Sequence, residues 1–456
     1  MIPGLQHPAS YRDPSGYMFT GADGRLMRYV HRRYAPHYNH LMSSGLYKAL
    51  TSARLLVPHE ELAPREGDAD CYRILQPEFV APWTFPYEWS FQQLREAALV
   101  TLRINRIALD HGAILKDATA YNLQLRAYGL QWIDTLSFER HVEGQPWTAF
   151  GPFLQHFLYP LLLYRYLPET SPAMLTSYPD GIPPRMVSAA LRGKARLSLN
   201  HRLYVHLPAT MSRKAEGAAA STRKVSTKSI RQNLQQLEDW IGKLSLPPDP
   251  TWERYYTETI LSDAYLQEKS AVIEDWLSQA NAQSVLDLGC NTGRFSLIAA
   301  ERGAEVTALD TDPRCIDVLW RAAQQGKKAV FPIVADLCQP SPALGWEGAE
   351  RGSLLSRIAG REMVLALALV HHLAIGRNVP LSMIASLFAR LTAEHLIVEW
   401  IPKEDEKVQG LLQHRADVFD DYTQASFDVH FGKHFVTRSV HHSQASNRVL
   451  YWFQKK

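Results

Sequence analysis

Apolar and polar positions follow two different patterns along the chain, and the change comes near residue 262. From there on, short apolar runs alternate with stretches in which apolar residues recur at the spacing of one helix face. The predicted strands are "SVLDLG", "EVTALD", "AVFPIVAD", "MVLALALV" and "HLIVEW". Such alternation predicts an α/β fold whose mostly parallel sheet has helices on both faces, with ligands bound beyond the carboxyl ends of the strands.

The first 206 residues lack this alternation and predict an α+β domain. In "WSFQQLREAALVTLRINRIALDHG", apolar residues at helical spacing predict a long helix that ends at Gly112. "YNLQLRAYGLQWIDT" fits two strands joined by a turn at Gly129. Residues 147–167 and 184–200 have helical patterns.

The hydrophobic pattern weakens between these regions. Residues 207–229 are rich in Ala, Ser, Thr and Lys, which is typical of a linker, and a helix is predicted from about 230 to 244. We therefore expect an N-terminal domain over 1–206, a basic flexible linker over 207–229 and a second domain over 230–456. Residues 191–231 hold ten Lys or Arg and one acid, Glu216, so this stretch carries +9 although the whole chain carries +3.

Composition indicates an ordinary soluble globular protein, with 46% hydrophobic and 21% charged residues. The four cysteines lie far apart without the spacing of a metal site, which favours reduced thiols and a cytoplasmic protein without a bound metal. No secretory signal is recognisable at the N-terminus, and "FLQHFLYPLLLYRYL" is too short and too interrupted to span a membrane.

"VLDLGCNTGRFS" carries the most specific chemistry in the chain. A buried strand ends at Asp287, which we count among the cofactor-binding candidates, and Gly289 and Gly293 permit a tight turn before a helix whose first amides face a ligand. Asp310 ends the next strand, where a carboxylate can accept hydrogen bonds from both hydroxyls of a ribose. The two glycines alone would also fit another kind of nucleotide-binding turn.

This region, over about residues 250–405, resembles the class I S-adenosylmethionine-dependent methyltransferases. The resemblance implies a Rossmann-like domain that binds S-adenosylmethionine (SAM). It assigns Gly289, Cys290, Asn291 and Gly293 to the turn beside the methionine part and Asp310 to the ribose. It also assigns Asp336 and Leu337, at the end of "IVADL", to the adenine, and it matches "LALALVHHL" to the fourth strand and its active-site loop.

Residues just before the first strand are further candidates for the cofactor site. In "TWERYYTETILSDAYLQEKS", Tyr256 and Lys269 are placed to cover the cofactor and to fix its carboxylate. Core packing is an equal alternative for the tyrosine, and a solvated helix face for the lysine.

His371 and His372 follow the fourth strand, over the expected position of the methyl group. A neutral imidazole is a suitable base near pH 7, and one of the rings alternatively packs under the loop. Glu399 ends the fifth strand on the same edge, where it could bind an acceptor hydroxyl or amine, or form a structural salt bridge. We take all three as catalytic candidates.

Missing motifs narrow the methyl acceptor. The chain has no [Asn/Asp]-Pro-Pro-aromatic motif at residues 368–372, no Pro-Cys dipeptide and no paired-glutamate loop, which mark methyltransferases of planar amino groups, cytosine C5 and arginine. A hydroxyl or amine of a glycan or another small polar metabolite is the favoured acceptor.

Residues 114–139 show a different similarity. Asp117, Asn122 and Asp134 have nearly the spacing of the catalytic aspartate and the two metal ligands of phosphotransferases. No glycine-rich phosphate loop and no lysine-bearing third strand are recognisable upstream. We interpret this stretch as a kinase-like fragment that serves substrate binding, with a vestigial phosphotransfer site.

"LKDATAYNLQ", "IDTLSFE", "EWSFQQLREAAL" and "VLDLGCNTGRFS" together resemble a bacterial methyltransferase family often labelled nodulation-protein-like. The resemblance covers most of the chain and implies methylation of a glycan or envelope component. Two alternatives remain open: an RNA-associated methyltransferase that uses the basic stretch 191–231, and a bifunctional kinase and methyltransferase.

Overall fold

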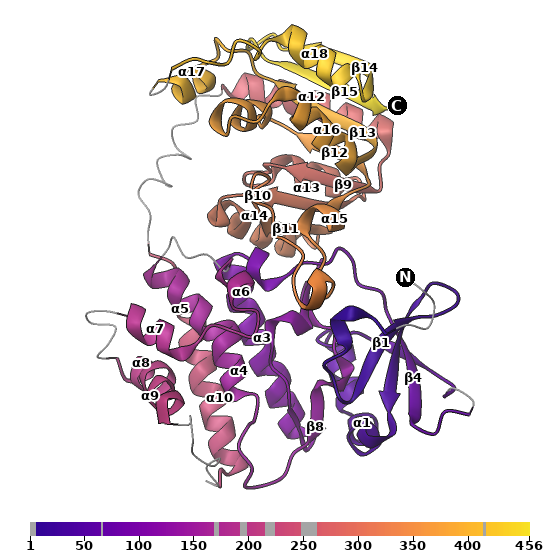
Figure 1. The fold of residues 1–456 in the computed structure, drawn as a ribbon, viewed down its shortest axis with the longest axis vertical. Coiled ribbons are helices and arrows are strands. Elements are labelled where there is room, and N and C mark those ends of the chain that lie inside the picture. The colour runs from indigo at the N-terminus through magenta and orange to yellow at the C-terminus, as the bar shows by residue number, and fades with distance from the viewer. Residues whose placement is uncertain are drawn as a thin grey trace. The chain divides into compact units, whose positions relative to one another are not determined.

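The computed structural model describes residues 6–64, 67–167, 173–191, 198–214, 224–247, 262–413 and 416–456. The chain divides into two compact units (Figure 1). The first unit contains residues 1–247 together with 343–352, and the second contains residues 248–342 and 353–456. Within the described ranges, no helix is both long and apolar enough to cross a lipid bilayer.

The first unit begins with a four-stranded antiparallel sheet. Its order is β1 (Gly16–Thr20), β2 (Leu26–His31), β4 (Cys71–Pro77) and β3 (His59–Leu62). Helices α1 (Ala35–Ser43) and α2 (Leu46–Ser52) follow β2 in the chain. Tyr34, Tyr38 and Leu41 are buried, so this part has a core of its own.

The long helix predicted in the first domain is α3 (Phe91–Asp110), which confirms the helical pattern. Ser90 caps its first turn because its hydroxyl accepts the N–H of Gln93, whose side chain in turn accepts the N–H of Ser90. Gly112 follows the helix with a φ angle of +68°, a conformation that glycine adopts without strain.

Short strands and further helices complete the first unit. The predicted strand-turn-strand is β6 (Leu123–Arg126) with β7 (Gly129–Trp132), and β5 (Ala113–Leu115) pairs with β8 (Phe138–Arg140). The helices that follow are α4 (Phe150–Phe153), α5 (Tyr159–Tyr166), α6 (Met174–Ser177), α7 (Pro184–Ala190), α8 (Leu199–His201), α9 (Leu207–Lys214) and α10 (Thr227–Gly242). Of the predicted helical span 147–167, residues 150–166 are helical, and the helix predicted over 184–200 is interrupted after Ala190.

The division between the units differs from the domain boundary that the sequence suggested. Residues 207–214 of the expected linker form α9, and residues 215–223 lie outside the described residues. Helix α10 belongs to the first unit, although its sequence placed it after the linker. Arg106 of α3 forms an ion pair with Glu238 of α10 at 2.7 Å, and α10 buries Leu234 and Leu237. The polar composition of 207–229 indicated a connecting segment. It did not indicate that α10, the next helix, packs on the first unit.

The second unit is built on a seven-stranded mixed sheet that is mostly parallel. Its order is β11 (Val330–Val334), β10 (Glu305–Asp310), β9 (Ser284–Leu288), β12 (Arg361–Ala366), β13 (Thr392–Trp400), β15 (Val449–Lys455) and β14 (Phe435–His442). The first five strands are parallel, and β15 and β14 are antiparallel additions at one side. The predicted parallel α/β fold is confirmed, and β14 and β15 extend it.

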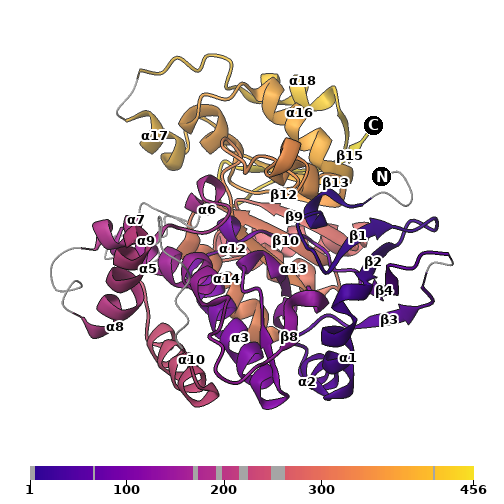
Figure 2. The same cartoon turned by 60° about the horizontal axis from the view of Figure 1, so that its bottom comes forward.

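Helices cover both faces of this sheet (Figure 2). On one face lie α12 (Asp263–Ala280), α13 (Arg294–Glu301) and α14 (Pro313–Gly326), which share a buried core with the sheet. On the other face lie α16 (Leu381–Leu391) and α18 (Gln424–Gly432), where Phe388 contacts Phe431 and Phe427 contacts Phe453 of β15. Two short helices, α15 (Leu354–Ile358) and α17 (Glu406–Leu412), lie in the connections.

Residues 343–352 leave the second unit after β11 and belong to the first. They form a small loop that is closed by backbone hydrogen bonds between Leu344 and Arg351. The carboxylate of Glu350 accepts the N–H of Trp346 at 2.8 Å and pairs with Arg12 at 2.9 Å. The chain therefore passes between the two units three times.

Candidate functional site

The turn after β9 lies at the carboxyl edge of the parallel strands. Gly289, Asn291 and Gly293 have φ angles of +73°, +50° and +81°, in the left-handed region that glycine and asparagine tolerate best. The carbonyl of Leu309 in β10 accepts the N–H groups of both Gly289 and Cys290, at 2.8 and 2.9 Å. These bonds fix the turn to the neighbouring strand, so α13 begins directly at the sheet edge.

Gly293 also permits a close approach between α13 and α14. A Cβ atom at this position would lie 2.2 Å from Cδ1 of Leu319 in α14, which is fully buried. No real Cβ contact is that short, because atoms at this distance overlap. The sequence therefore requires glycine here for packing as well as for the backbone angle.

Asp287 lies inside the second unit, not on its surface. The side chain is 2% exposed and accepts a hydrogen bond of 2.6 Å from the hydroxyl of Ser296, in the first turn of α13. Burial raises the pKa of the Asp287 carboxyl to about 6. The hydrogen bond between Asp287 and Ser296 therefore joins the end of β9 to the first turn of α13.

Asp310 and the turn face each other across the ends of β9 and β10. The Asp310 carboxylate accepts the N–H of Asn291 at 2.7 Å and the N–H of Asp312 at 2.9 Å. Burial raises its pKa even though these amides favour the charged form. A carboxylate has about four acceptor positions, so its oxygens can also accept hydrogen bonds from a diol.

Asp336 follows the next strand, β11, and is half-buried together with Leu337. It accepts the N–H of Cys338 at 2.8 Å and forms an ion pair of 2.5 Å with Arg377. Arg377 comes from the segment just after the two histidines of the fourth strand. The sequence did not single it out, because no local motif contains it.

These residues fit SAM. Strands β9, β10 and β11 are parallel and adjacent, so the glycine turn, Asp310 and Asp336 lie along one edge of the sheet. Asp310 would hold the ribose hydroxyls, Asp336 with Leu337 the adenine, and the turn the methionine part. The left-handed backbone of the turn agrees with this assignment.

The two histidines after β12 differ strongly in exposure. His371 is 2% exposed, and its Nδ1 has no hydrogen-bond partner among the described residues, whereas His372 is exposed. Their ring centroids are 4.2 Å apart. Burial, with help from His372 and Arg448, lowers the pKa of His371 to about 3, so its ring is neutral near pH 7.

A buried group of charged side chains lies at the carboxyl end of β13 and near the start of α12. Glu399 is fully buried and accepts hydrogen bonds from the ammonium group of Lys269 and the hydroxyl of Tyr265. Arg448 lies 3.6 Å from Glu399 and binds Asp405 with two hydrogen bonds of 2.8 and 3.1 Å. Burial raises the pKa of Glu399, but Lys269 and Arg448 outweigh burial and lower it.

This group changes the picture of two predicted site residues. Glu399 forms a buried salt bridge, one of the two roles that its sequence position left open, and its partner is Lys269, whose side chain is 5% exposed. Tyr256, the other residue predicted to cover the cofactor, lies outside the described residues. Arg448 and Asp405 were not found from the sequence because they lie far from every motif.

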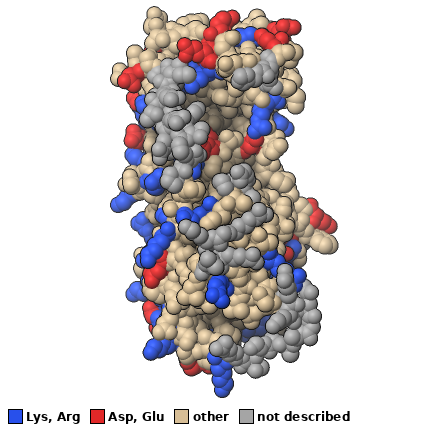
Figure 3. All heavy atoms as spheres, turned by 90° about the vertical axis from the view of Figure 1, so that its left-hand side faces the viewer, with Lys and Arg blue, Asp and Glu red and all other residues tan. Residues whose placement is uncertain are grey.

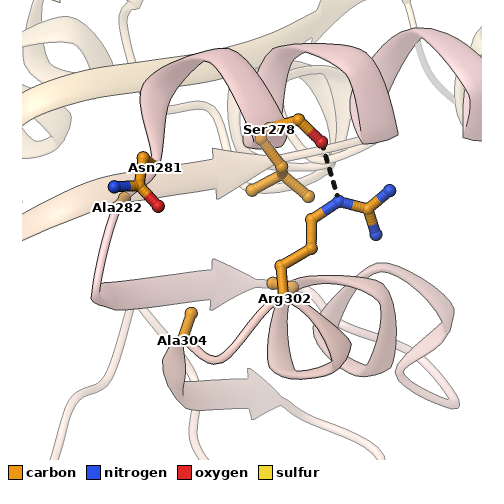
Figure 4. A pocket seen from close by; sticks show the side chains of 7 residues that line it. Ser278, Asn281, Ala282, Arg302 and Ala304 are labelled. Atoms are coloured by element: carbon orange, nitrogen blue, oxygen red, sulfur yellow. Dashed lines mark hydrogen bonds between the residues drawn. The ribbon is translucent and has the colours of Figure 1, made fainter.

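The structure has a pocket of about 240 Å³ at a different place (Figure 4). Ser278 and Asn281, at the end of α12, and Arg302 and Ala304, after α13, line it. Arg302 donates a hydrogen bond of 3.0 Å to the hydroxyl of Ser278. These residues precede β9 and β10, so the pocket lies at the amino ends of the strands, opposite the cofactor residues.

The first unit brings the three phosphotransferase-like residues together. Asn122 donates hydrogen bonds to Asp117 at 3.0 Å and to Ser137 at 3.3 Å, and Ser137 donates to Asp134 at 2.5 Å. Burial, and then the charge of Asp134, raise the pKa of Asp117. Arg28 of β2 forms an ion pair of 2.8 Å with Asp134.

Arg28 binds a second carboxylate as well, that of Asp13 at 2.6 Å. Lys116 lies 3.8 Å from Asp13 and donates to the hydroxyl of Ser15. In the described ranges, no three His, Cys, Asp or Glu side chains are placed to hold a metal ion. Asp134 is thus bound by a cation of the protein itself, which the sequence pattern did not indicate.

The chain matches known methyltransferases. A family model described as a methyltransferase domain matches residues 286–343. The nodulation protein NoeA of Rhizobium meliloti (strain 1021) is 32% identical over 460 residues, which cover 98% of this chain and 95% of that protein. An uncharacterized methyltransferase of Mycobacterium tuberculosis (strain ATCC 25618 / H37Rv) is 47% identical over 51 residues, which cover 11% of this chain and 21% of that protein.

Solved methyltransferase structures are similar to part of the chain. Magnesium protoporphyrin IX methyltransferase from Synechocystis PCC 6803, with bound SAM, has 18% identity, covers 45% of this chain and 89% of that one, and has a TM-score of 0.32. The N-methyltransferase NodS from Bradyrhizobium japonicum WM9 has 14% identity, covers 43% of this chain and 99% of that one, and has a TM-score of 0.31.

The match to NoeA extends through both units, and the methyltransferase family model begins at Leu286, in the strand that leads into the glycine turn. The chain belongs to the NoeA family of nodulation proteins, and it is a SAM-dependent methyltransferase.

Proposed function

We propose that this enzyme transfers the methyl group of SAM to a hydroxyl or amine of a glycan or another small polar metabolite, with His372 as the base. The observation that carries the proposal is the histidine pair after β12, in which an exposed ring packs on a buried one. Such a pair offers one ring to an acceptor and keeps the other as its support.

Among the predicted catalytic residues, His372 is the one that an acceptor can reach. Glu399 is fully buried and bound to Lys269, and His371 is 2% exposed. SAM supplies an activated methyl group on a sulfonium centre. An acceptor hydroxyl forms the new O–C bond as the S–C bond breaks, and the neutral imidazole of His372 takes the hydroxyl proton. An amine acceptor forms an N–C bond and gives up its proton in the same way.

The buried ring of His371 packs against the ring of His372. Its low pKa keeps it uncharged beside His372, so it adds no positive charge that would oppose protonation of the outer ring. The buried charges of Arg448, Glu399 and Asp405 lie near enough to His371 to act on its pKa. We assign these residues to positioning, since none of them is exposed to an acceptor.

The test is transfer of labelled methyl from SAM by the purified full chain. Acceptors are offered as separate fractions: oligosaccharides with free hydroxyls, amino sugars, small hydroxy and amino metabolites, and total RNA. We expect label in a carbohydrate or small polar fraction, and loss of that label in His372→Ala. Label found in RNA alone would overturn the acceptor class and favour the RNA-associated alternative.

We further propose that the first unit binds the acceptor and does not transfer phosphate. The ion pair between Arg28 and Asp134 supports the second part of this proposal, because a carboxylate already paired with arginine is a poor magnesium ligand. The full chain is titrated with ATP and Mg²⁺ by calorimetry. Heat of binding that is absent in Asp134→Ala would contradict this proposal and support the bifunctional alternative.

A further inference from the structure

One face of the first unit carries an exposed apolar stripe. A continuous helical run consists of α8, a π-helical turn over Arg202–His206, and α9. Along it, Leu199, Leu203, Leu207 and Met211 are 68%, 43%, 51% and 57% exposed. Each follows the previous one by four residues, and single exposed apolar side chains are ordinary on protein surfaces, but a row of four is not.

The π-helical turn aligns this row. An α-helix has about 3.6 residues per turn, so side chains four residues apart drift steadily around its axis. A π-helical turn contains more than four residues per turn. Side chains four residues apart therefore drift around the axis in the opposite direction there. The turn at Arg202–His206 therefore keeps the apolar side chains of α8 and α9 on one side.

The opposite side of the same helix is firmly packed. Tyr204 and Val205 are 3% and 0% exposed. The Tyr204 ring stacks on Trp240 of α10 with centroids 5.7 Å apart, and its carbonyl accepts a hydrogen bond of 2.9 Å from the hydroxyl of Tyr159. The helix is held on the unit by this inner face, so its outward apolar row is a fixed feature of the surface.

The sequence that carries the row is basic. Residues 181–214 contain seven Lys or Arg and no Asp or Glu. Arg202 is exposed on the helix itself, and the exposed Arg185 of α7 hydrogen-bonds to Ser212 near the end of α9. Figure 3 faces the side on which α8 and α9 are labelled at the left of Figure 1, and there Lys and Arg, with some Asp and Glu, lie among uncharged side chains of the first unit.

We propose that this face, formed by Leu199, Leu203, Leu207, Met211 and the flanking arginines, docks on the surface of an anionic lipid bilayer. Leucine and methionine side chains enter the boundary between headgroups and acyl chains, while arginines bind the headgroup phosphates. The helix lies in the plane of the interface and does not cross it. This inference is independent of the methyl acceptor.

Charge and hydrophobicity together favour a membrane over other occupants. A second copy of the chain would bring a basic face against an identical basic face, which is unfavourable. An RNA strand would satisfy the arginines but would leave the leucines without an apolar partner. An anionic bilayer supplies both an apolar layer and negative phosphates.

The experiment is co-sedimentation of the full chain with two kinds of vesicle, phosphatidylcholine alone and phosphatidylcholine mixed with phosphatidylglycerol. We expect binding to the anionic vesicles that weakens with added salt. The double variant Leu203→Ser/Leu207→Ser should bind those vesicles about tenfold more weakly or worse, because it removes the inserted side chains. Both leucines are exposed, so the variant should keep the thermal stability of the wild type.

The matched control is Met383→Ser/Val429→Ser, which changes two exposed apolar residues of the second unit. It should bind anionic vesicles as the wild type does. Equal binding by the leucine variant would overturn the proposal, as would equal loss in the control. Wild-type chain that stays in solution but dimerises through these leucines, by light scattering, would assign the face to a second copy; retention on RNA alone would assign it to nucleic acid.

Discussion

The ammonium group of Lys269 lies against the carboxylate of Glu399 inside the second unit, with side chains that are 5% and 0% exposed. Lys269 belongs to α12, at the start of the unit, and Glu399 to β13, near the end of the parallel strands. Taking two charges out of water is costly, and only their mutual attraction and further hydrogen bonds offset that cost. Tyr265 and Arg448 supply those further contacts.

We expect Lys269→Met to lower the free energy of unfolding of the second unit by about 3 kcal/mol, because it leaves Glu399 buried without its ammonium partner. The double variant Lys269→Met/Glu399→Gln should lose less than the sum of the two single changes, since it removes both charges. Urea unfolding of the four proteins measures this coupling. Strict additivity would mean that the two groups do not stabilise each other.

The control is the partly exposed ion pair between Lys403 and Asp417, whose side chains are 24% and 43% exposed. Water screens such a pair, so Lys403→Met should cost less than about 1 kcal/mol. A similar loss in both lysine variants would point to side-chain packing and not to the buried charge.

The buried His371 predicts a dependence of stability on pH. Burial lowers its pKa from 6.5 to about 3, so between these values the unfolded chain binds a proton that the folded chain does not. The stability due to the neutral ring is therefore fully present above pH 6.5 and is lost as the pH falls toward 3. In His371→Gln this contribution disappears, and the slope of the unfolding free energy against pH should fall by up to about 1.4 kcal/mol per pH unit.

The measurement is urea unfolding of wild type and variant at matched pH values below and above neutrality. The comparison cancels other groups, such as Asp287, whose pKa is raised and whose contribution has the opposite sign. Parallel curves for the two proteins would contradict a neutral, buried His371.

Local motifs predicted which residues lie at the carboxyl ends of β9 and β10, whereas contacts between residues far apart in the chain were not predictable. Gly289, Gly293 and Asp310 lie within one strand-turn-helix-strand segment, where turn geometry and strand ends restrict the residue types. Lys269 and Glu399 are 130 residues apart, and each is a common surface residue by composition. Only the fold brings them together, so no local pattern distinguished a buried pair from a solvated one.

In the first unit, too, contacts within one loop were predictable and a contact between distant segments was not. The spacing of Asp117 and Asn122 follows from one loop, and the structure brings them into contact. The partner of Asp134 is Arg28, which lies on a strand more than 100 residues earlier, in a segment with no recognisable motif. The sequence pattern therefore identified Asp117, Asn122 and Asp134, which are close in the chain. It did not identify Arg28, which only the tertiary structure brings to them.

Two glycines with similar backbone angles should respond very differently to alanine. At Gly303 φ is +92° and a Cβ atom would meet nothing within 4 Å, so Gly303→Ala should cost about 1 kcal/mol from the backbone alone. At Gly293 φ is +81° and a Cβ atom would overlap the buried Leu319, so Gly293→Ala should cost about 3 kcal/mol and weaken SAM binding. Thermal unfolding and calorimetric titration compare the pair, and equal losses would refute the packing role of Gly293.

Asp310 and Asp312 are two residues apart, and we expect different effects when each is replaced by alanine. One substitution should affect cofactor binding and the other should affect helix capping. Asp310→Ala removes the acceptor expected for the ribose, and we expect SAM affinity in calorimetry to fall by about thirtyfold or more. Asp312 accepts the N–H of Arg314 and caps α14, so Asp312→Ala should cost about 1 kcal/mol of stability with little change in affinity. Unchanged affinity in Asp310→Ala would remove the proposed ribose contact.

The exposed ring of the histidine pair should carry the proton transfer, and the buried ring should only position it. We expect His372→Ala to leave SAM affinity unchanged while kcat falls by about a hundredfold or more, because the acceptor loses its base. His371→Gln should lower kcat less and raise KM for the acceptor, since it disturbs the support and leaves the base. A pH profile separates the roles: the limb of kcat against pH that reports the base should vanish in His372→Ala and remain in His371→Gln. If the limb survives without His372, the base is another group, and the exposed position of this ring has only a structural meaning.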